Sequence, residues 1–267
     1  MKAEYIQLSY LQVMMATILI LANGLISLFL RLNLGRRIVI ASIRTVVQLL
    51  LVGLVLDQVF DVRSVFLVLA MMGVMTVIAG FAAVRRTEHR YSGVWLNTFL
   101  SVWASSWMIT VLALIAIVQV EPWYRPQYAI PLLGMVLGNS LTGVSLGLDR
   151  MGDELVRGRD TVELVLALGG TSWEAAHRPI STAVRTGLIP TLNSMAVVGI
   201  VSLPGMMTGQ LLAGVDPIEA VKYQVVMMFL IASGTALGTV SAVLLTYRSL
   251  FNSRNQFDHL ALTSTVR

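Results

Sequence analysis

Long apolar runs alternate with short polar segments along almost the whole chain. A bilayer core requires a helix of about 20 residues, and each apolar run is close to that length. We expect about seven runs to span a membrane, and they cover residues 8–30, 38–56, 65–84, 94–118, 129–148, 183–203 and 217–247. The pattern therefore predicts an all-α fold, a polytopic transmembrane helical bundle.

The basic residues predict how this bundle is oriented. Most of the 19 Lys and Arg residues fall in polar segments that alternate spans would place on one side of the membrane. The other side holds Lys2, Arg63, Arg125 and Lys222. Because cytoplasmic loops carry the excess of Lys and Arg, we expect the N-terminus outside and the C-terminus in the cytoplasm. This distribution also accounts for the net charge of +5 without a nucleic-acid partner.

Composition supports the membrane class and excludes several chemistries. Of the 267 residues, 56% are hydrophobic and 12% are charged, whereas a soluble domain carries about 25% charge. The absence of cysteine excludes disulfides and thiolate metal sites. The chain also lacks the GxxxxGK(S/T), HExxH and GxSxG motifs. We expect one transmembrane domain over 1–267 that is not an enzyme and has no catalytic residues or cofactor of its own.

The main polar break, 149–182, lies on the predicted cytoplasmic side. Asp160 followed by Glu163 predicts a capping box at the start of a short helix, and Gly169-Gly170 predicts its end. The residues between them are mostly Leu and Val, so this helix needs something to bury against.

A second helix is predicted after the glycines. Thr171 or Ser172 can cap it, and Glu174 falls in its first turn. We expect Pro179 to close this helix or to mark the bend into the next span. Two short helices would then form a rigid cytoplasmic corner.

This segment resembles a known docking loop. The run Glu163…Ala167-Leu168-Gly169-Gly170-Thr171…Trp173-Glu174-Ala175 is similar to the EAA-type coupling loop of ABC-transporter permeases. In that loop a Glu precedes a Gly by six residues, as Glu163 precedes Gly169, and the Gly turn fits a cleft on the ATPase. Leu164-Val165 replaces the usual alanines, and Pro179 lies nearer the Gly than in that pattern. The resemblance implies ATPase-coupling residues, namely Glu163, Leu168, Gly169, Gly170, Trp173 and Glu174. Helix capping alone is the other interpretation of the two Glu residues.

Three further motifs resemble the FetB-type family of ABC permeases, which is related to plant aluminium-tolerance membrane subunits. They are Arg44-Thr45-Val46-Val47-Gln48-Leu49, Pro131-Leu132-Leu133-Gly134-Met135…Gly138-Asn139-Ser140 and Leu203-Pro204-Gly205-Met206-Met207-Thr208-Gly209. The resemblance covers the chain from the first span to about Tyr247. It implies a homodimeric, multi-pass permease of the bacterial inner membrane that exports iron or another metal ion. A separate ABC ATPase subunit would carry the ATP and Mg.

Several polar side chains at membrane depth are candidates for the transport pathway. Arg44 and Gln48 share one helix face, and an intramembrane charge indicates function unless Arg44 is a structural anchor. Asn139 and Asn193 can line the route or bond neighbouring helices. Met206 and Met207 follow Pro204 in a turn too short and glycine-rich to span, which we expect to be re-entrant or interfacial. Thioethers suit Cu(I) rather than iron, so the transported metal stays unassigned.

Small residues recur at helical spacing in the fifth span. Gly134, Gly138 and Thr142 form one stripe, and Asn139, Gly143 and Gly147 form another. Such stripes let helices approach closely. They predict that this helix is the centre of the bundle or the seam of a dimer.

Two other function classes stay open. An ion-driven secondary transporter would need no ATPase, but such proteins usually carry several intramembrane acidic groups, whereas the predicted spans hold essentially Arg44 alone. An intramembrane enzyme would need a nucleophile and base at membrane depth, and no such pair is evident. Co-purification with a small ATPase would favour the ABC permease.

Overall fold

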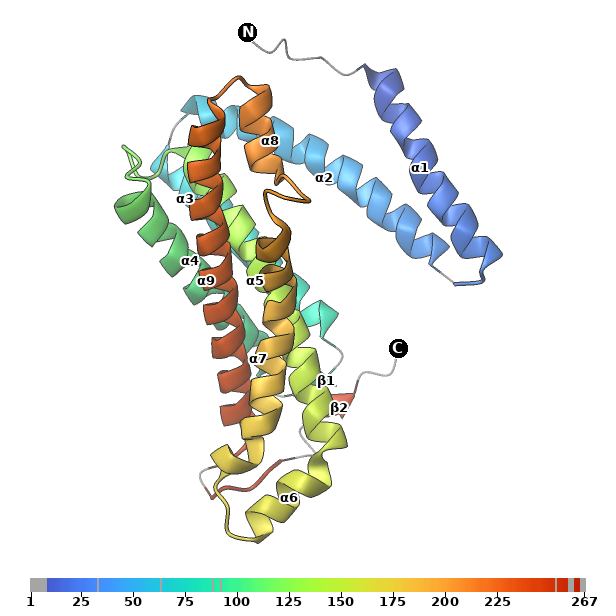
Figure 1. Cartoon of the computed structure of the whole chain (residues 1–267), viewed down its shortest axis with the longest axis vertical. Coiled ribbons are helices and arrows are strands. Elements are labelled where there is room, and N and C mark those ends of the chain that lie inside the picture. Colours follow the sequence, from blue (N-terminus) through green and yellow to red (C-terminus); the bar gives the residue numbers. More distant parts are fainter. Residues whose placement is uncertain are drawn as a thin grey trace. The chain divides into compact units, whose positions relative to one another are not determined.

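The computed structural model describes residues 9–32, 34–62, 64–87, 89–91, 93–252, 254–258 and 262–264. These residues are almost entirely helical, as Figure 1 shows. The strands among them are one two-residue antiparallel pair, β1 (His89–Arg90) with β2 (Thr263–Ser264). The all-α prediction is therefore confirmed. Lys2 and Arg63, which the orientation prediction uses, lie outside the described residues.

The chain forms two compact units. The first contains α1 (Tyr10–Phe29) and α2 (Gly35–Val62). Ser9 caps α1 through a capping box with Gln12, which satisfies backbone N–H groups at the start of the helix. The hydroxyl of Ser27 accepts a hydrogen bond from the Leu34 N–H at 3.1 Å. This bond ties the end of α1 to the start of α2 and shapes a helical hairpin.

The second unit is the larger bundle. Its helices are α3 (Val65–Arg86), α4 (Val94–Leu112), the π-helical turn η1 (Ala113–Ile117), α5 (Pro126–Arg157), α6 (Arg159–Ala167), α7 (Ser172–Val197), α8 (Gly205–Leu212) and α9 (Pro217–Leu250). α5 lies at the centre, where it packs against α3, α4, α7 and α9. Within this unit, α6 lies at the end of the bundle opposite α8 (Figure 1).

Small residues bring α5, α7 and α9 into close contact. A Cβ atom added to Gly143 would lie 2.5 Å from Thr235 Cγ2 and 3.0 Å from the carbonyl oxygen of Gly187. A Cβ atom on Gly187 would in turn lie 2.5 Å from the carbonyl oxygen of Gly143. Only glycine permits this approach of helix backbones. Gly143 and Gly147 thus face neighbours within the chain, and α5 is the central helix of its unit.

Among the described residues, six helices are long and apolar enough to cross a membrane: α1, α2, α3, α4 with η1, α5 and α9. Sequence patterning predicts about seven spans, the additional one at 183–203. The corresponding helix is α7, which begins earlier, at Ser172, and ends earlier, at Val197. The transmembrane bundle is confirmed in type, whereas seven spans and the orientation of the termini stay predictions.

The polar break differs from its predicted form in two places. α6 begins at Arg159 with Gly158 as its N-cap, so Asp160 lies in the first turn and does not cap the helix. α7 continues through Pro179 and Pro190 to Val197, so the second helix is neither short nor closed by proline. A proline inside a helix removes one backbone hydrogen bond. Pro179 is buried beside Ile180 in the bundle core, and this packing offsets the lost bond.

Candidate functional site

The connection between α6 and α7 is held by two glycines with different roles. The N–H of Gly170 donates to the Val165 carbonyl at 2.9 Å, and that of Gly169 donates to the Leu166 carbonyl at 3.1 Å. These are the two bonds of a Schellman cap. Gly169 has φ +87°, which side chains rarely adopt, and a Cβ atom on Gly170 would lie 2.8 Å from the Val165 carbonyl oxygen. We call α6, residues 168–171 and the first turn of α7 the helix corner.

A capping box starts α7, as the sequence predicts. The Glu174 N–H donates to the Thr171 hydroxyl at 3.2 Å, and the Thr171 N–H donates to the Glu174 carboxylate at 2.8 Å. The Thr171 hydroxyl also lies 3.0 Å from that carboxylate and donates to it. The bond from the Thr171 N–H, followed by the bond from its hydroxyl, lowers the pKa of Glu174 below its usual value. Glu163 does not form the predicted capping box with Asp160; its carboxylate instead accepts a hydrogen bond from Arg159 Nε at 2.7 Å within α6.

An aromatic chain fastens the helix corner to α9. Trp173 meets the ring of Tyr247 edge-on at 5.8 Å between centroids, and Phe251 and Phe257 continue the series. The hydroxyls of Ser172 and Tyr247 lie 2.8 Å apart. These contacts join the first turn of α7 to the end of α9.

A turn at the C-terminal end of the chain adds to the contacts between the helix corner and α9. The sequence does not predict this turn. It consists of Phe251, Asn252 and residues 254–258, and Phe251 pairs with Phe257 across it. The Asn255 side-chain oxygen accepts from the Ser172 N–H at 3.2 Å. The only indication in the sequence is the clustering of Tyr247, Phe251 and Phe257 at the end of the last apolar run, in a segment otherwise polar.

The helix corner has one buried and one exposed apolar face. Val162 is 2% exposed and belongs to the core, with Val165 and Leu166 packed beside it. Leu168 is 80% exposed, and Leu164 and Trp173 are also exposed. A shallow hollow beside them is lined by Glu163, Leu166, Ala167, Gly169, Gly170, Arg254, Asn255, Gln256 and Phe257. Exposed apolar side chains grouped at a polar end of the molecule are typical of a protein interface.

The candidate pathway residues are divided between the two units. Arg44 and Gln48 are exposed on α2, in the first unit. Asn139 and Asn193 are exposed on α5 and α7, in the second unit. The Asn139 side-chain amide donates to the Met135 carbonyl at 2.8 Å. α5 and α7 run in opposite directions (Figure 1), and their backbones approach closely at Gly143 and Gly187. Asn139 precedes Gly143 and Asn193 follows Gly187, so both lie towards the same end of the bundle from that contact.

Met206 and Met207 diverge although they are adjacent on α8. Met206 lines a hollow that includes Met135 and Met227, whereas Met207 lines another that includes Met195 and Met228. Adjacent residues of a helix point about 100° apart, which explains the separation.

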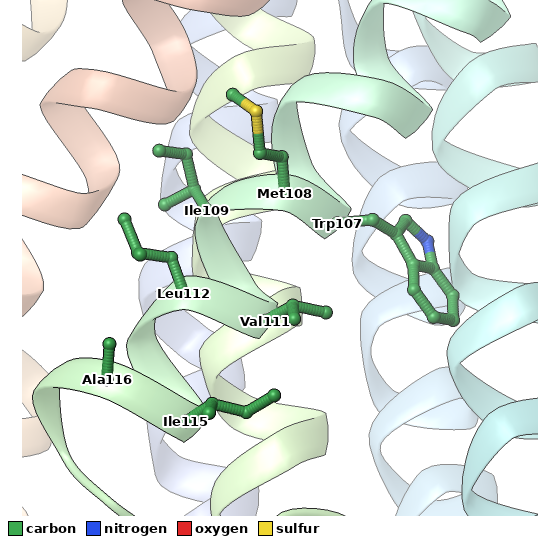
Figure 2. A pocket seen from close by; sticks show the side chains of 7 residues that line it. All are labelled: Trp107, Met108, Ile109, Val111, Leu112, Ile115 and Ala116. Atoms are coloured by element: carbon green, nitrogen blue, oxygen red, sulfur yellow. The ribbon is translucent and has the colours of Figure 1, made fainter.

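Another hollow, on the outside of the bundle, is wholly apolar (Figure 2). Met108, Ile109, Val111, Leu112, Ile115 and Ala116 line it along α4 and η1, together with Trp107. The Trp107 indole N–H donates to the Thr76 hydroxyl at 2.9 Å and so satisfies its polar atom within the bundle. A surface of this kind suits lipid tails and offers nothing to a polar substrate.

Long apolar helices, close glycine packing between them and one polar end define a polytopic α-helical membrane protein. The chain belongs to UPF0014, described as an uncharacterised protein family, whose model matches residues 10–251. No solved structure matches the chain.

Relatives in bacteria and plants match over most of their length. The UPF0014 membrane protein slr1647 of Synechocystis is 40% identical over 225 residues, 84% of this chain and 87% of that protein. The "Probable iron export permease protein FetB" of Escherichia coli is 34% identical over 242 residues, 91% of this chain and 92% of FetB. "Protein ALUMINUM SENSITIVE 3" of Arabidopsis thaliana is 30% identical over 244 residues, 91% of this chain and 88% of that protein. These matches confirm the resemblance to FetB-type proteins.

Proposed function

We propose that this chain is the permease subunit of an ABC transporter that exports a metal ion across the bacterial inner membrane. Its similarity to a relative named as a probable iron export permease favours iron as that ion. The observation that carries the proposal is the helix corner, which presents exposed Leu168 and Trp173 on a rigid glycine-capped frame. ATP and Mg²⁺ would be bound by a separate ATPase subunit.

The helix corner suits a coupling element because it is rigid and well connected. The Schellman cap fixes the exit of α6, and the Thr171–Glu174 box fixes the start of α7. A cleft on the ATPase would receive Leu168 and the Gly169 turn, with Trp173 at its edge. When the cleft moves, α7 follows as one helix, and the Ser172–Tyr247 contact passes the movement to α9.

The exposed polar face of α5 and α7 supports a homodimer with its route between the two copies. Asn139 and Asn193 are exposed within predicted spans. Placing a side-chain amide against lipid tails costs free energy. Gly138, beside Asn139, is also exposed and would allow another helix to approach. In this proposal the two copies meet along this face and shield the amides from lipid.

Arg44 and Gln48 fit the same proposal as part of the route. Both are exposed on α2, and an arginine within an apolar helix needs a polar environment in the bilayer. A partner copy or a water-filled passage would supply it. A fixed positive charge suits an anionic metal complex, or a metal cation accompanied by a carboxylate.

Reconstitution with a candidate ATPase tests the docking site. We expect Leu168→Glu to abolish permease-dependent ATP hydrolysis in liposomes, because a charge at an 80% exposed apolar position disrupts docking without disturbing the fold. Val156→Glu, on α5 and also exposed, is the matched control and should keep full turnover. Full turnover by Leu168→Glu would place docking elsewhere. Metal export that continues without any ATPase would instead establish a secondary transporter.

A further inference from the structure

Three methionines from three helices converge on one hollow at the end of the bundle opposite α6. Met195 comes from α7, Met207 from α8 and Met228 from α9, and all three line a hollow of about 330 Å³. Sequence spacing does not bring them together, because 12 to 33 residues separate them along the chain. The fold therefore brings three methionine side chains to the lining of one space.

Gln224 adds a second and independent observation at this hollow. It lines the same space and is 7% exposed. Among the described residues, its Oε1 atom is buried without a hydrogen-bond partner. A buried carbonyl oxygen without a partner is costly in a protein interior, so something beyond these residues is expected to satisfy it. The rest of the lining is uncharged: Val198, Gly199, Leu203, Val221, Val225 and Phe229.

A neighbouring hollow provides a natural comparison. It is lined by Met135, Met206 and Met227, so it offers the same number of thioethers, and by Gln210, whose Oε1 atom also has no partner among the described residues. Arg125 also lines it, and a guanidinium is positively charged at any physiological pH. A cation would be repelled there and not in the hollow lined by Met207.

We propose that Met195, Met207 and Met228 form a binding site for a soft monovalent metal ion, with Cu(I) and Ag(I) as the ions that fit. Thioether sulfur is a soft ligand that selects Cu(I) over harder cations such as Fe(II) and Mg²⁺. The chain contains no cysteine, so thioethers are its only sulfur donors. Gln224 lines the same hollow with a neutral amide and so places no charge beside the site. This inference concerns equilibrium binding by this chain alone and does not depend on ATP-driven export.

Competition binding with the purified full-length chain tests the site. Cu(I) would be buffered by a chromogenic Cu(I) chelator, and bound metal would be measured at equilibrium. We expect one tightly bound Cu(I) per chain, and a loss of at least about tenfold in affinity in Met207→Leu and in Met228→Leu, since even residues that only support metal ligands change affinity by 10- to 100-fold. Leucine preserves the volume of methionine, so the fold should be kept.

Met206→Leu is the matched control because it changes the adjacent residue of the same helix. It should bind Cu(I) like the unchanged chain. Absence of tight Cu(I) binding, or an equal loss in Met206→Leu, would overturn the proposal. X-ray absorption of the Cu(I)-loaded chain should show about three sulfur ligands, and a shell of oxygen and nitrogen alone would overturn the site without any variant. Circular dichroism and gel filtration show whether each variant is folded. If Met207→Leu or Met228→Leu is misfolded, Met195→Leu takes its place in the binding experiment.

Discussion

The hydroxyl of Ser172 lies 2.8 Å from the hydroxyl of Tyr247, and this contact joins the first turn of α7 to the last turns of α9. The two residues are 75 positions apart. The same serine also donates its backbone N–H to Asn255. The helix corner is thus linked to the bundle by a polar contact as well as by the edge-on contact of Trp173 with the Tyr247 ring.

Removing this contact should weaken the link without unfolding the chain. We expect Tyr247→Phe to lower the free energy of unfolding by about 0.5–1.5 kcal/mol, since the ring and its packing are kept and one hydrogen bond is lost. A double-mutant cycle with Ser172→Ala, followed by thermal unfolding in detergent, isolates the pair. Additive effects of the two changes would mean that the hydroxyls do not interact.

Alanine substitutions at the two glycines of the helix corner should destabilise the fold for different reasons. Gly170→Ala places a methyl group 2.7 Å from Val165 Cγ1, which should cost about 1–3 kcal/mol through overpacking. Gly169→Ala meets no atom within 4 Å, but its φ of +87° should cost about 1–2 kcal/mol. Gly73→Ala is the control, since its Cβ also meets nothing within 4 Å and it lies inside α3. Thermal midpoints should fall in the first two variants and not in the third.

The Thr171–Glu174 box should make stability depend on pH in the acid range. Hydrogen bonds to the carboxylate lower the pKa of Glu174 in the folded chain, so the charged form is favoured on folding. The resulting stabilisation is complete above the ordinary pKa of a glutamate and is lost as the pH falls through the lowered, folded-state value. Glu174→Gln should therefore have a lower thermal midpoint than the unchanged chain at pH 6, and the difference should shrink towards pH 3. A difference that stays constant would show that the charge contributes nothing.

Much of this architecture follows from the sequence because a bilayer imposes strong rules. The length of each apolar run predicts the long helices, because a segment that crosses a bilayer must form its backbone hydrogen bonds within itself, as a helix does. Gly169-Gly170 and Thr171 with Glu174 predict the end of α6 and the start of α7, because caps are local chemistry. Their docking role stays a prediction.

What the sequence does not predict depends on contacts between distant segments. Asp160 has the spacing of a cap, yet α6 begins one residue before it and Glu163 pairs with Arg159 instead. Pro179 usually ends a helix, but burial in the core lets α7 continue. Met195, Met207 and Met228 share a hollow only because α7, α8 and α9 meet there, which helical periodicity does not reveal.

Two of the glycines of α5, Gly143 and Gly138, distinguish packing within the chain from the proposed packing between two copies. A Cβ atom on Gly143 would lie 2.5 Å from Thr235 Cγ2 and 3.0 Å from the Gly187 carbonyl oxygen, whereas one on Gly138 meets nothing within 4 Å. We expect Gly143→Ala to destabilise the fold by about 1–3 kcal/mol. Gly138→Leu should leave each copy folded but prevent close contact along the exposed face.

Crosslinking in native membranes and light scattering in detergent would measure the outcome. Gly138→Leu should shift the protein from dimer to monomer while its circular dichroism stays unchanged. Gly143→Ala should instead lower the thermal midpoint, and its surviving folded fraction should still dimerise. A Gly138→Leu variant that remained fully dimeric would remove this face from the interface, and the proposed route between Asn139 and Asn193 of two copies would have to be abandoned with it.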